Sequence, residues 1–136
     1  CREQGIRICL ENLFDMPEEY VLGQWDWLLE RYPADYMGIC LDTGHGYMSW
    51  GEKLPEIIRK YKERIYAVHL HDNFGTTDLH LIPGEGAIPW QKVMEELSDS
   101  IYQGPLLLEV GCYETDVESF LKRAHQAGEN LLKMWS

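Results

Sequence analysis

Residues 66–86 read YAVHLHDNFGTTDLHLIPGEG, and this stretch decides how the rest of the chain is interpreted. Its first half alternates between two faces of a β-strand, so that His69 and His71 share one face. Its second half adds Asp78 and His80 before a Pro-Gly-Glu-Gly turn. A solvated loop after a strand would also be polar, but His69 stands inside the apolar run itself. We therefore predict a strand that leads into a chemically active loop.

Three more strands are predicted at residues 6–11, 37–42 and 105–110, each with an acid at or near its carboxyl end. Amphipathic helices are expected at about 18–31, 53–64, 90–98 and 117–133, because apolar residues recur there at helical spacing. The alternation of strand and helix four times predicts parallel strands joined by crossover helices. We expect a single α/β domain over residues 1–136, since this length suffices for one domain but not for two.

The second strand leads into the sequence Asp42-Thr43-Gly44-His45-Gly46. We predict that residues 43–46 form a tight turn, across which the carboxylate of Asp42 and the imidazole of His45 face one pocket. Because Gly44 and Gly46 have no Cβ atom, the backbone at these positions could approach a ligand closely.

Four strand ends carry residues of the kind that bind metals. In a parallel sheet or barrel all the carboxyl ends of strands lie at the same edge, so these side chains should converge. They are Glu11, Asp42, His69 and Glu109. Three carboxylates and one imidazole make a mostly oxygen site, which suits Mn²⁺, Mg²⁺ or Co²⁺ and also admits Zn²⁺. Each residue alone could be an ordinary strand-end polar group, and only their joint placement favours a metal site.

The chain is strongly acidic, with 12 Lys and Arg against 23 Asp and Glu and a formal net charge of -11. This balance weighs against a nucleic-acid partner, because phosphate backbones are usually bound by basic surfaces. The sequence has neither a signal peptide nor an apolar run long enough to span a membrane, so no membrane partner is expected.

The four cysteines form no Cys-x-x-Cys pair, and Cys9 and Cys40 lie inside apolar strands. Such thiols behave as small hydrophobic groups. We therefore expect no disulfide framework, a reducing compartment and a cytoplasmic location. The first residue is Cys1 rather than Met, which suggests a fragment or a processed product.

Several motifs together resemble the xylose-isomerase-like TIM-barrel superfamily: ICLEN at 8–12, CLDTGH at 40–45, VHLHD at 68–72, DLH at 78–80, PGEG at 83–86 and LLLEVG at 106–111. This superfamily includes sugar-phosphate isomerases and epimerases, ketose 3-epimerases, inosose dehydratase and endonuclease IV. The resemblance covers nearly the whole chain but only the C-terminal half of such a barrel, whose complete form takes about 250 residues. The four strands here match the fifth to eighth strands of the family.

The resemblance implies a shared divalent-metal site at Glu11, Asp42, His69 and Glu109. The ligand is placed at His69 because His-Leu-His-Asp resembles the family's His-x-x-Asp order, but His71 remains an alternative. In sugar epimerases of this type the metal binds adjacent carbonyl and hydroxyl oxygens of the substrate and stabilises an enediolate. The two glutamates would flank the reacting carbon and transfer its proton.

The remaining polar residues of the motifs are expected to bind substrate. His45 matches a family residue that contacts the substrate oxygen or a further metal. His71, Asp78 and His80 would lie beside or over the pocket. The expected partner is a small sugar or sugar phosphate.

Two other functions remain open. Endonuclease IV carries Asp-Arg-His as ligands for an additional zinc in the loop that matches Asp78-Leu79-His80, but the central arginine is Leu79 here. The second alternative is a non-catalytic half-barrel, whose outer strands would leave unpaired edges. Such a chain could form a homo-oligomer or pair with a separate N-terminal half-barrel.

Overall fold

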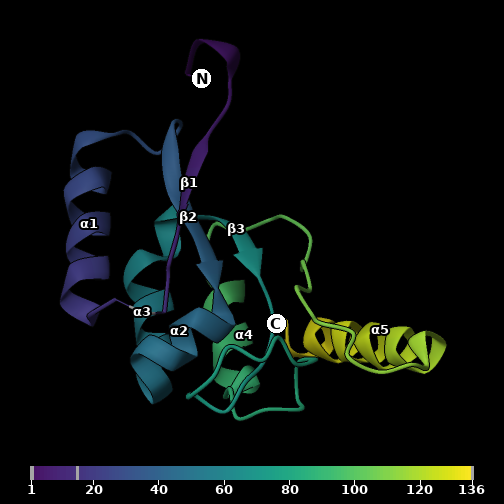
Figure 1. The fold of residues 1–136 in the computed structure, drawn as a ribbon. Coiled ribbons are helices and arrows are strands. Elements are labelled where there is room, and N and C mark those ends of the chain that lie inside the picture. Colours follow the sequence, from purple (N-terminus) through teal and green to yellow (C-terminus); the bar gives the residue numbers. More distant parts are fainter. Residues whose placement is uncertain (1, 15, 136) are drawn as a thin grey trace.

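The computed structural model describes residues 2–14 and 16–135 (Figure 1). Three strands are formed: β1 (Ile8–Glu11), β2 (Met37–Asp42) and β3 (Ile65–His69). The α-helices are α1 (Glu18–Arg31), α2 (Thr43–Trp50), α3 (Leu54–Tyr61), α4 (Trp90–Ser98) and α5 (Val117–Met134). Short 3-10 turns lie at Arg2–Gln4 and on either side of α3, at Gly51–Lys53 and Lys62–Arg64. The predicted α/β class is confirmed, and the helices near 18–31, 53–64, 90–98 and 117–133 lie where the apolar spacing placed them.

The strands form one parallel sheet in the order β1-β2-β3. Glu11 is in register with Cys40, and Asp42 with His69, so the carboxyl ends of the three strands lie at one edge. β2 is the central strand and all of its residues are buried. Because it has a neighbour on both sides and helices against it, its sequence MGICLD is apolar until the final aspartate.

Two predicted strands are shorter than the sequence indicated. β1 begins at Ile8 rather than at residue 6, because its partner β2 begins at Met37, the register partner of Ile8. The predicted strand at 105–110 is reduced to an isolated parallel bridge between Leu70 and Leu108. The backbone of Leu70 donates to Leu107 O at 2.8 Å and accepts from Glu109 N at 3.0 Å. This segment meets the chain only at Leu70, one residue beyond the end of β3. It therefore forms no continuous ladder of hydrogen bonds with β3.

The core lies between the sheet and the helices α1, α3 and α4. Ile39, Leu41 and Val68 from the sheet pack with apolar side chains of these helices, and each of the three is at most 1% exposed. Burial on this scale stabilises by about 1.5–3 kcal/mol per large apolar side chain. Helix α5 extends away from the other helices (Figure 1), yet Leu131 near its end reaches the same core. A second apolar cluster joins Phe120 and neighbouring alanines of α5 to Ile82.

Cys9, Cys40 and Cys112 are free thiols, and Cys40 is buried. Cys1 lies outside the described residues. The absence of a disulfide framework from the whole chain therefore stays a prediction.

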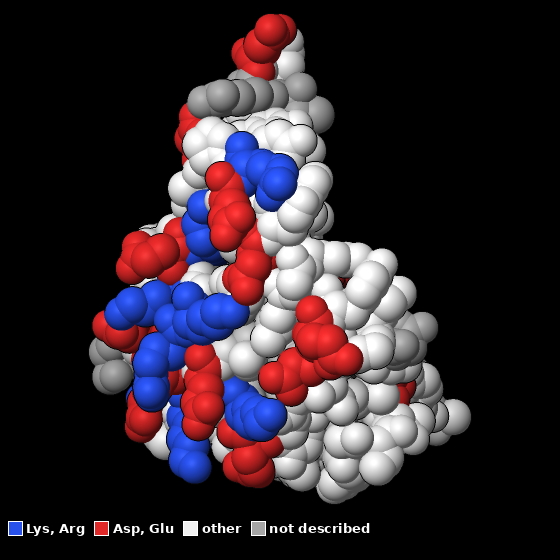
Figure 2. All heavy atoms as spheres, turned by 90° about the vertical axis from the view of Figure 1, so that its left-hand side faces the viewer, with Lys and Arg blue, Asp and Glu red and all other residues white. Residues whose placement is uncertain are grey.

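The surface charges are mixed where the helices face solvent. Figure 2 shows the side of the molecule that carries α1, where Lys and Arg side chains are interleaved with Asp and Glu. Oppositely charged side chains of the helices and their flanking turns form ion pairs, such as Lys62 with Asp99 at 2.8 Å and Lys60 with Asp26 at 3.1 Å. This face therefore presents no continuous basic patch of the kind that binds a phosphate backbone. None of the helices that the structure describes is both long and apolar enough to cross a membrane.

Candidate metal centre

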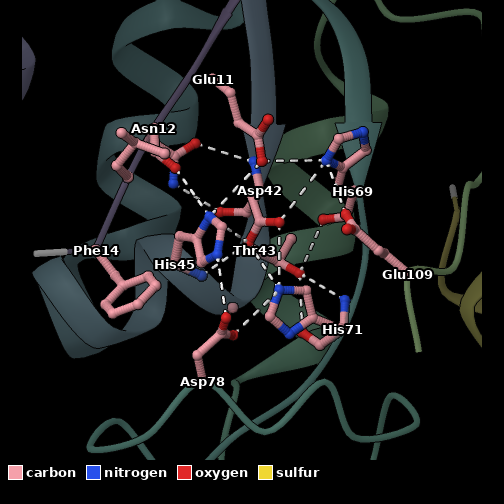
Figure 3. A network of polar contacts seen from close by, with 12 residues as sticks. Glu11, Asn12, Phe14, Asp42, Thr43, His45, His69, His71, Asp78 and Glu109 are labelled. Carbon is pink, nitrogen blue, oxygen red and sulfur yellow. Dashed lines mark hydrogen bonds and ion pairs between the residues drawn. The ribbon is translucent and has the colours of Figure 1, made fainter. Parts of the chain in front are cut away.

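Residues from the strand ends converge at one edge of the sheet (Figure 3). His69 Nδ1 lies 2.9 Å from Glu109 Oε2, 3.2 Å from Glu11 Oε1 and 3.9 Å from Asp42 Oδ2. One ligand atom from each of these four residues lies within 4.8 Å of the others. We call this group the strand-end cluster. It gathers the four residues that the sequence proposed as metal ligands, and it could hold a divalent cation.

Asp42 is fully buried, and it both ends β2 and caps the helix that follows. Its Oδ1 atom accepts a hydrogen bond from His45 N at 2.7 Å and caps α2, which starts at Thr43. The prediction of a tight turn at residues 43–46 was therefore wrong. Helical geometry places His45 one turn from Asp42, with its Nδ1 atom 3.6 Å from Asp42 Oδ1.

Asn12 is a site residue to which the sequence pattern gave no role. Its side chain is fully buried and joins the ends of β1 and β2. The amide nitrogen donates to Asp42 O at 2.8 Å, and the amide oxygen accepts from Asp42 N at 2.9 Å. The Asn12 carbonyl also lies 3.0 Å from His45 Nδ1. Asn12 therefore positions Asp42 and His45, a role that an amide directly after a strand could have suggested.

A second group of ligand-type side chains lies beside the strand-end cluster, and we call it the loop cluster. It consists of His45, His71, Asp78 and His80, whose ligand atoms also lie within 4.8 Å of one another. Asp78 Oδ2 lies 3.1 Å from His80 Nε2 and 3.5 Å from His45 Nε2. The rings of His71 and His80 stack with centroids 4.0 Å apart.

The two histidines of the His-Leu-His motif lie in different clusters. His69 contacts the two glutamates, while His71 is fully buried and its Nε2 atom lies 3.0 Å from Asp42 Oδ1. His71 reaches Asp78 as well, with Nε2 3.8 Å from Oδ1. Asp42 thus belongs to the strand-end cluster and also contacts the loop cluster. The geometry favours His69 as the strand-end ligand, although its role stays a prediction.

Gly44 is required for packing rather than for the approach of a ligand. A Cβ atom at this position would lie 1.9 Å from Cε1 of the His71 ring. At Gly46 the nearest atoms are side-chain atoms of Leu54 and Trp50. The predicted reason for these glycines is therefore replaced by close packing of α2 against His71 and the core.

Replacing Gly44 by Ala is expected to destabilise the chain by about 1–3 kcal/mol, because the fully buried His71 ring has no space to retreat. Urea denaturation measures this loss. Gly23→Ala is the matched control, since a Cβ there meets nothing within 4 Å on the exposed face of α1, and it should leave stability unchanged or raise it by up to about 1 kcal/mol. Equal stabilities for the two variants would contradict the packing of His71 on Gly44.

Asp72 anchors the loop that carries Asp78 and His80. Its fully buried carboxylate accepts hydrogen bonds from the backbone of Asn73, Gly84 and Ile88 at 2.8–3.1 Å, and from Trp90 Nε1 at 2.7 Å. Such charge-assisted bonds are stronger than neutral ones, so they fix both ends of the loop. The sequence pattern did not single out Asp72 for this task.

His80 is held in an uncommon backbone conformation, with a φ of 46°. Its Nδ1 atom lies 2.8 Å from Glu109 O, and its Nε2 atom faces Asp78. Burial favours the neutral ring, but the Glu109 carbonyl and the Asp78 carboxylate outweigh it and raise the pKa of His80. A non-glycine residue with positive φ persists only where its surroundings fix it, and such residues are frequent at functional sites.

The charges of the two clusters fit a cation. Among the described residues no Lys or Arg forms an ion pair with Glu11, Asp42 or Glu109, although three carboxylates converge. In the loop cluster, Asp78 Oδ1 and His71 Nδ1 are buried without a hydrogen-bond partner. Converging carboxylates repel one another unless a positive charge lies between them. The residues present therefore fit a divalent metal.

A family model described as "Xylose isomerase-like TIM barrel" matches residues 1–134. An uncharacterized protein of Sinorhizobium fredii, y4fM, is 32% identical over 98% of this chain and 43% of its own length. The fructoselysine 3-epimerase of Escherichia coli O157:H7 is 30% identical over 94% of this chain and 47% of its own length.

A solved structure described as a D-tagatose 3-epimerase-like protein superimposes with a TM-score of 0.72 at 26% identity. The superposition covers 97% of this chain and 48% of that protein. The chain thus spans about half the length of the relatives that it matches. It corresponds to half of an α/β barrel, as the sequence predicted.

Proposed function

The chain belongs to the xylose isomerase-like TIM barrel family, and from this premise we propose that it is the C-terminal half of a divalent-metal-dependent sugar or sugar-phosphate isomerase/epimerase. One observation carries the proposal. Glu11 ends β1, and Glu109 follows the isolated bridge at Leu108, yet their carboxylates reach the same Nδ1 atom of His69 at 3.2 and 2.9 Å.

The glutamates would act as general base and general acid. Their side chains are 35% and 47% exposed, so both can meet a substrate, whereas Asp42 is fully buried. A carboxylate must lie within hydrogen-bond reach of the proton that it removes. In an isomerase or epimerase acting through an enediolate, one glutamate removes the proton next to the carbonyl and the other returns a proton.

Asp42, His69 and the two glutamates would hold the metal. When bound, a divalent cation supplies Lewis-acid polarisation of substrate oxygens. Asn12 and the backbone of α2 keep the Asp42 carboxylate oriented toward this point. The identity of the metal is proposed only as one of Mn²⁺, Mg²⁺, Co²⁺ and Zn²⁺.

His45 and the loop cluster would orient the substrate. His45 Nδ1 lies 3.7 Å from Glu11 Oε1, and its Nε2 atom faces Asp78, so its ring connects the two clusters. Phe14 packs against the His45 ring with centroids 5.1 Å apart and remains 39% exposed. His45 could therefore donate to a sugar hydroxyl beside Glu11, with His71, Asp78 and His80 around it.

The half-barrel leaves two backbone edges that another part of a barrel would cover. Within the described residues, neither the outer edge of β1 nor that of the segment at 107–109 has a neighbouring strand. Exposed edges of this kind are usually covered. We propose that an N-terminal half-barrel covers them, with self-association as the alternative.

Hydrogen exchange tests this function. The chain, alone and fused behind the N-terminal half of the fructoselysine 3-epimerase, would be incubated in D₂O with Mn²⁺ and with fructoselysine or D-tagatose. We expect deuterium to enter the carbon next to the carbonyl in the fused protein. A fused protein that binds Mn²⁺ and sugar but exchanges no hydrogen would contradict the proposal and favour a non-catalytic half-barrel.

The metal assignment of His69 gives a separate prediction. His69→Ala should weaken Mn²⁺ binding by at least about 100-fold, because it removes the imidazole nearest both glutamates. His71→Ala should have a smaller effect, since His71 contacts only Asp42 of the strand-end cluster. Calorimetric titration of both variants checks the order, and a larger loss in His71→Ala would move the ligand to His71.

The loop cluster favours one second candidate, endonuclease IV-like phosphodiester hydrolysis, because it could hold a further metal. The net charge of -11 and the replacement of the central arginine by Leu79 weigh against it. Cleavage of a duplex carrying one abasic site, assayed with Zn²⁺, distinguishes the two functions. Cleavage without sugar exchange would favour the nuclease.

A further inference from the structure

Cys40 lies on β2 near Glu11 and His69 of the strand-end cluster, and the proposed function gives its thiol no role. It stands two residues before Asp42 on β2, so both side chains point to the same face of the sheet. In register it lies between Glu11 on β1 and Ala67 on β3. The methyl side chain of Ala67 leaves the thiol beside the ring of His69, which is two residues further along β3.

The thiol is close enough to share ligands with that cluster. One ligand atom each from Glu11, Cys40 and His69 lies within 4.8 Å of the others. Cys40 is only 6% exposed, and within the described residues its sulfur atom makes no hydrogen bond. A buried thiol that faces a carboxylate and an imidazole is thus available as a third donor.

We propose that Glu11, Cys40 and His69 form a second, sulfur-containing subsite that takes soft divalent cations such as Cd²⁺. Thiolate is a soft ligand and prefers such cations, whereas Mg²⁺ and Mn²⁺ prefer carboxylate oxygens. Binding replaces the thiol proton by the metal: the S–H bond breaks, a sulfur–metal bond forms and the proton leaves to solvent.

The subsite shares Glu11 and His69 with the strand-end cluster, so the two sites cannot be filled independently. A soft cation held by Cys40 would also bind Glu11, a proposed acid/base group, and His69, the imidazole ligand. Neither residue would then be free to bind Mn²⁺ or to act on the substrate. Soft cations would therefore displace Mn²⁺ and inhibit the proposed reaction. The inference deepens the metal site of the proposed function, but its central claim about Cys40 can be tested without any activity.

Cadmium is the probe, because cadmium–thiolate bonds give an ultraviolet charge-transfer band. The parent protein would carry Cys1→Ser and Cys112→Ser, so that Cys9 and Cys40 are its only thiols. We expect the band to saturate at about one Cd²⁺ per chain. Adding Cys40→Ser or Cys40→Ala should abolish it, whereas Cys9→Ser, the matched control on β1, should retain it.

Mn²⁺ binding, followed by electron paramagnetic resonance, separates this inference from the proposed function. In the parent, Cd²⁺ should displace Mn²⁺ at least about 10-fold more effectively than in the Cys40 variants. A band that survives in both Cys40 variants, or that is absent from the parent, would overturn the subsite. Failure of the parent to bind Mn²⁺ would instead count against the proposed function, while the cadmium band still decides the role of Cys40. Circular dichroism establishes that each variant is folded.

Discussion

Glu11→Gln and Glu109→Gln are each expected to reduce sugar turnover by about 100- to 10,000-fold, the usual contribution of a positioned acid or base. Glutamine keeps the size of the side chain but cannot accept the proton of the sugar carbon. Both side chains are partly exposed, so the fold should be unaffected. The measurement is the rate of deuterium entry into the ketose, in the fused barrel loaded with Mn²⁺.

A control must separate proton transfer from metal loss, because both glutamates are also proposed ligands. The rates would be compared at Mn²⁺ concentrations that saturate each variant. Glu114→Gln is the matched control, since Glu114 pairs with the exposed Arg123 and belongs to neither ligand cluster. Near-normal rates in both Glu11→Gln and Glu109→Gln at saturating Mn²⁺ would refute their acid/base role.

Asp42→Asn is expected to lower Mn²⁺ affinity by at least about 100-fold, since changes even to groups behind the ligands cost 10- to 100-fold. Asp42 is fully buried, and its oxygens lie 3.0 Å from His71 Nε2 and 3.9 Å from His69 Nδ1. Asparagine can still cap α2, so the chain should fold. Calorimetric titration with Mn²⁺ measures the change.

Asp78→Asn is the companion variant for this prediction. Asp78 contacts the three histidines of the loop cluster but belongs to no ligand set of the strand-end cluster. The Asp78→Asn variant should therefore bind Mn²⁺ with nearly unchanged affinity. If Asp78→Asn were to weaken binding as much as Asp42→Asn, the principal metal site would be the loop cluster.

The convergence of Glu11, Asp42, His69 and Glu109 could be predicted because it follows from topology alone. Strands that alternate with helices are parallel, and parallel strands end at one edge. The helices were also predictable from apolar spacing, and α1 and α4 have the predicted bounds. These features depend on repeating patterns that a single sequence displays.

Other features depend on single contacts that no periodic pattern reveals. The Gly-rich segment after Asp42 has the composition of a turn, yet capping by Asp42 makes it the start of α2. His69 and His71 share a face by alternation, yet they belong to two different clusters, because their side chains meet different partners from distant segments of the chain. Asn12 and Asp72 act through buried hydrogen bonds to residues distant in sequence, which spacing cannot show.

The most direct test of the central claim is native mass spectrometry of the chain after equilibration with Mn²⁺. We expect about one Mn²⁺ per chain in the wild type and none in Asp42→Asn. The same spectra show whether the chains associate with one another. A wild-type chain that retains no metal, or an Asp42→Asn chain that retains as much as the wild type, would contradict a metal site built on these strand ends.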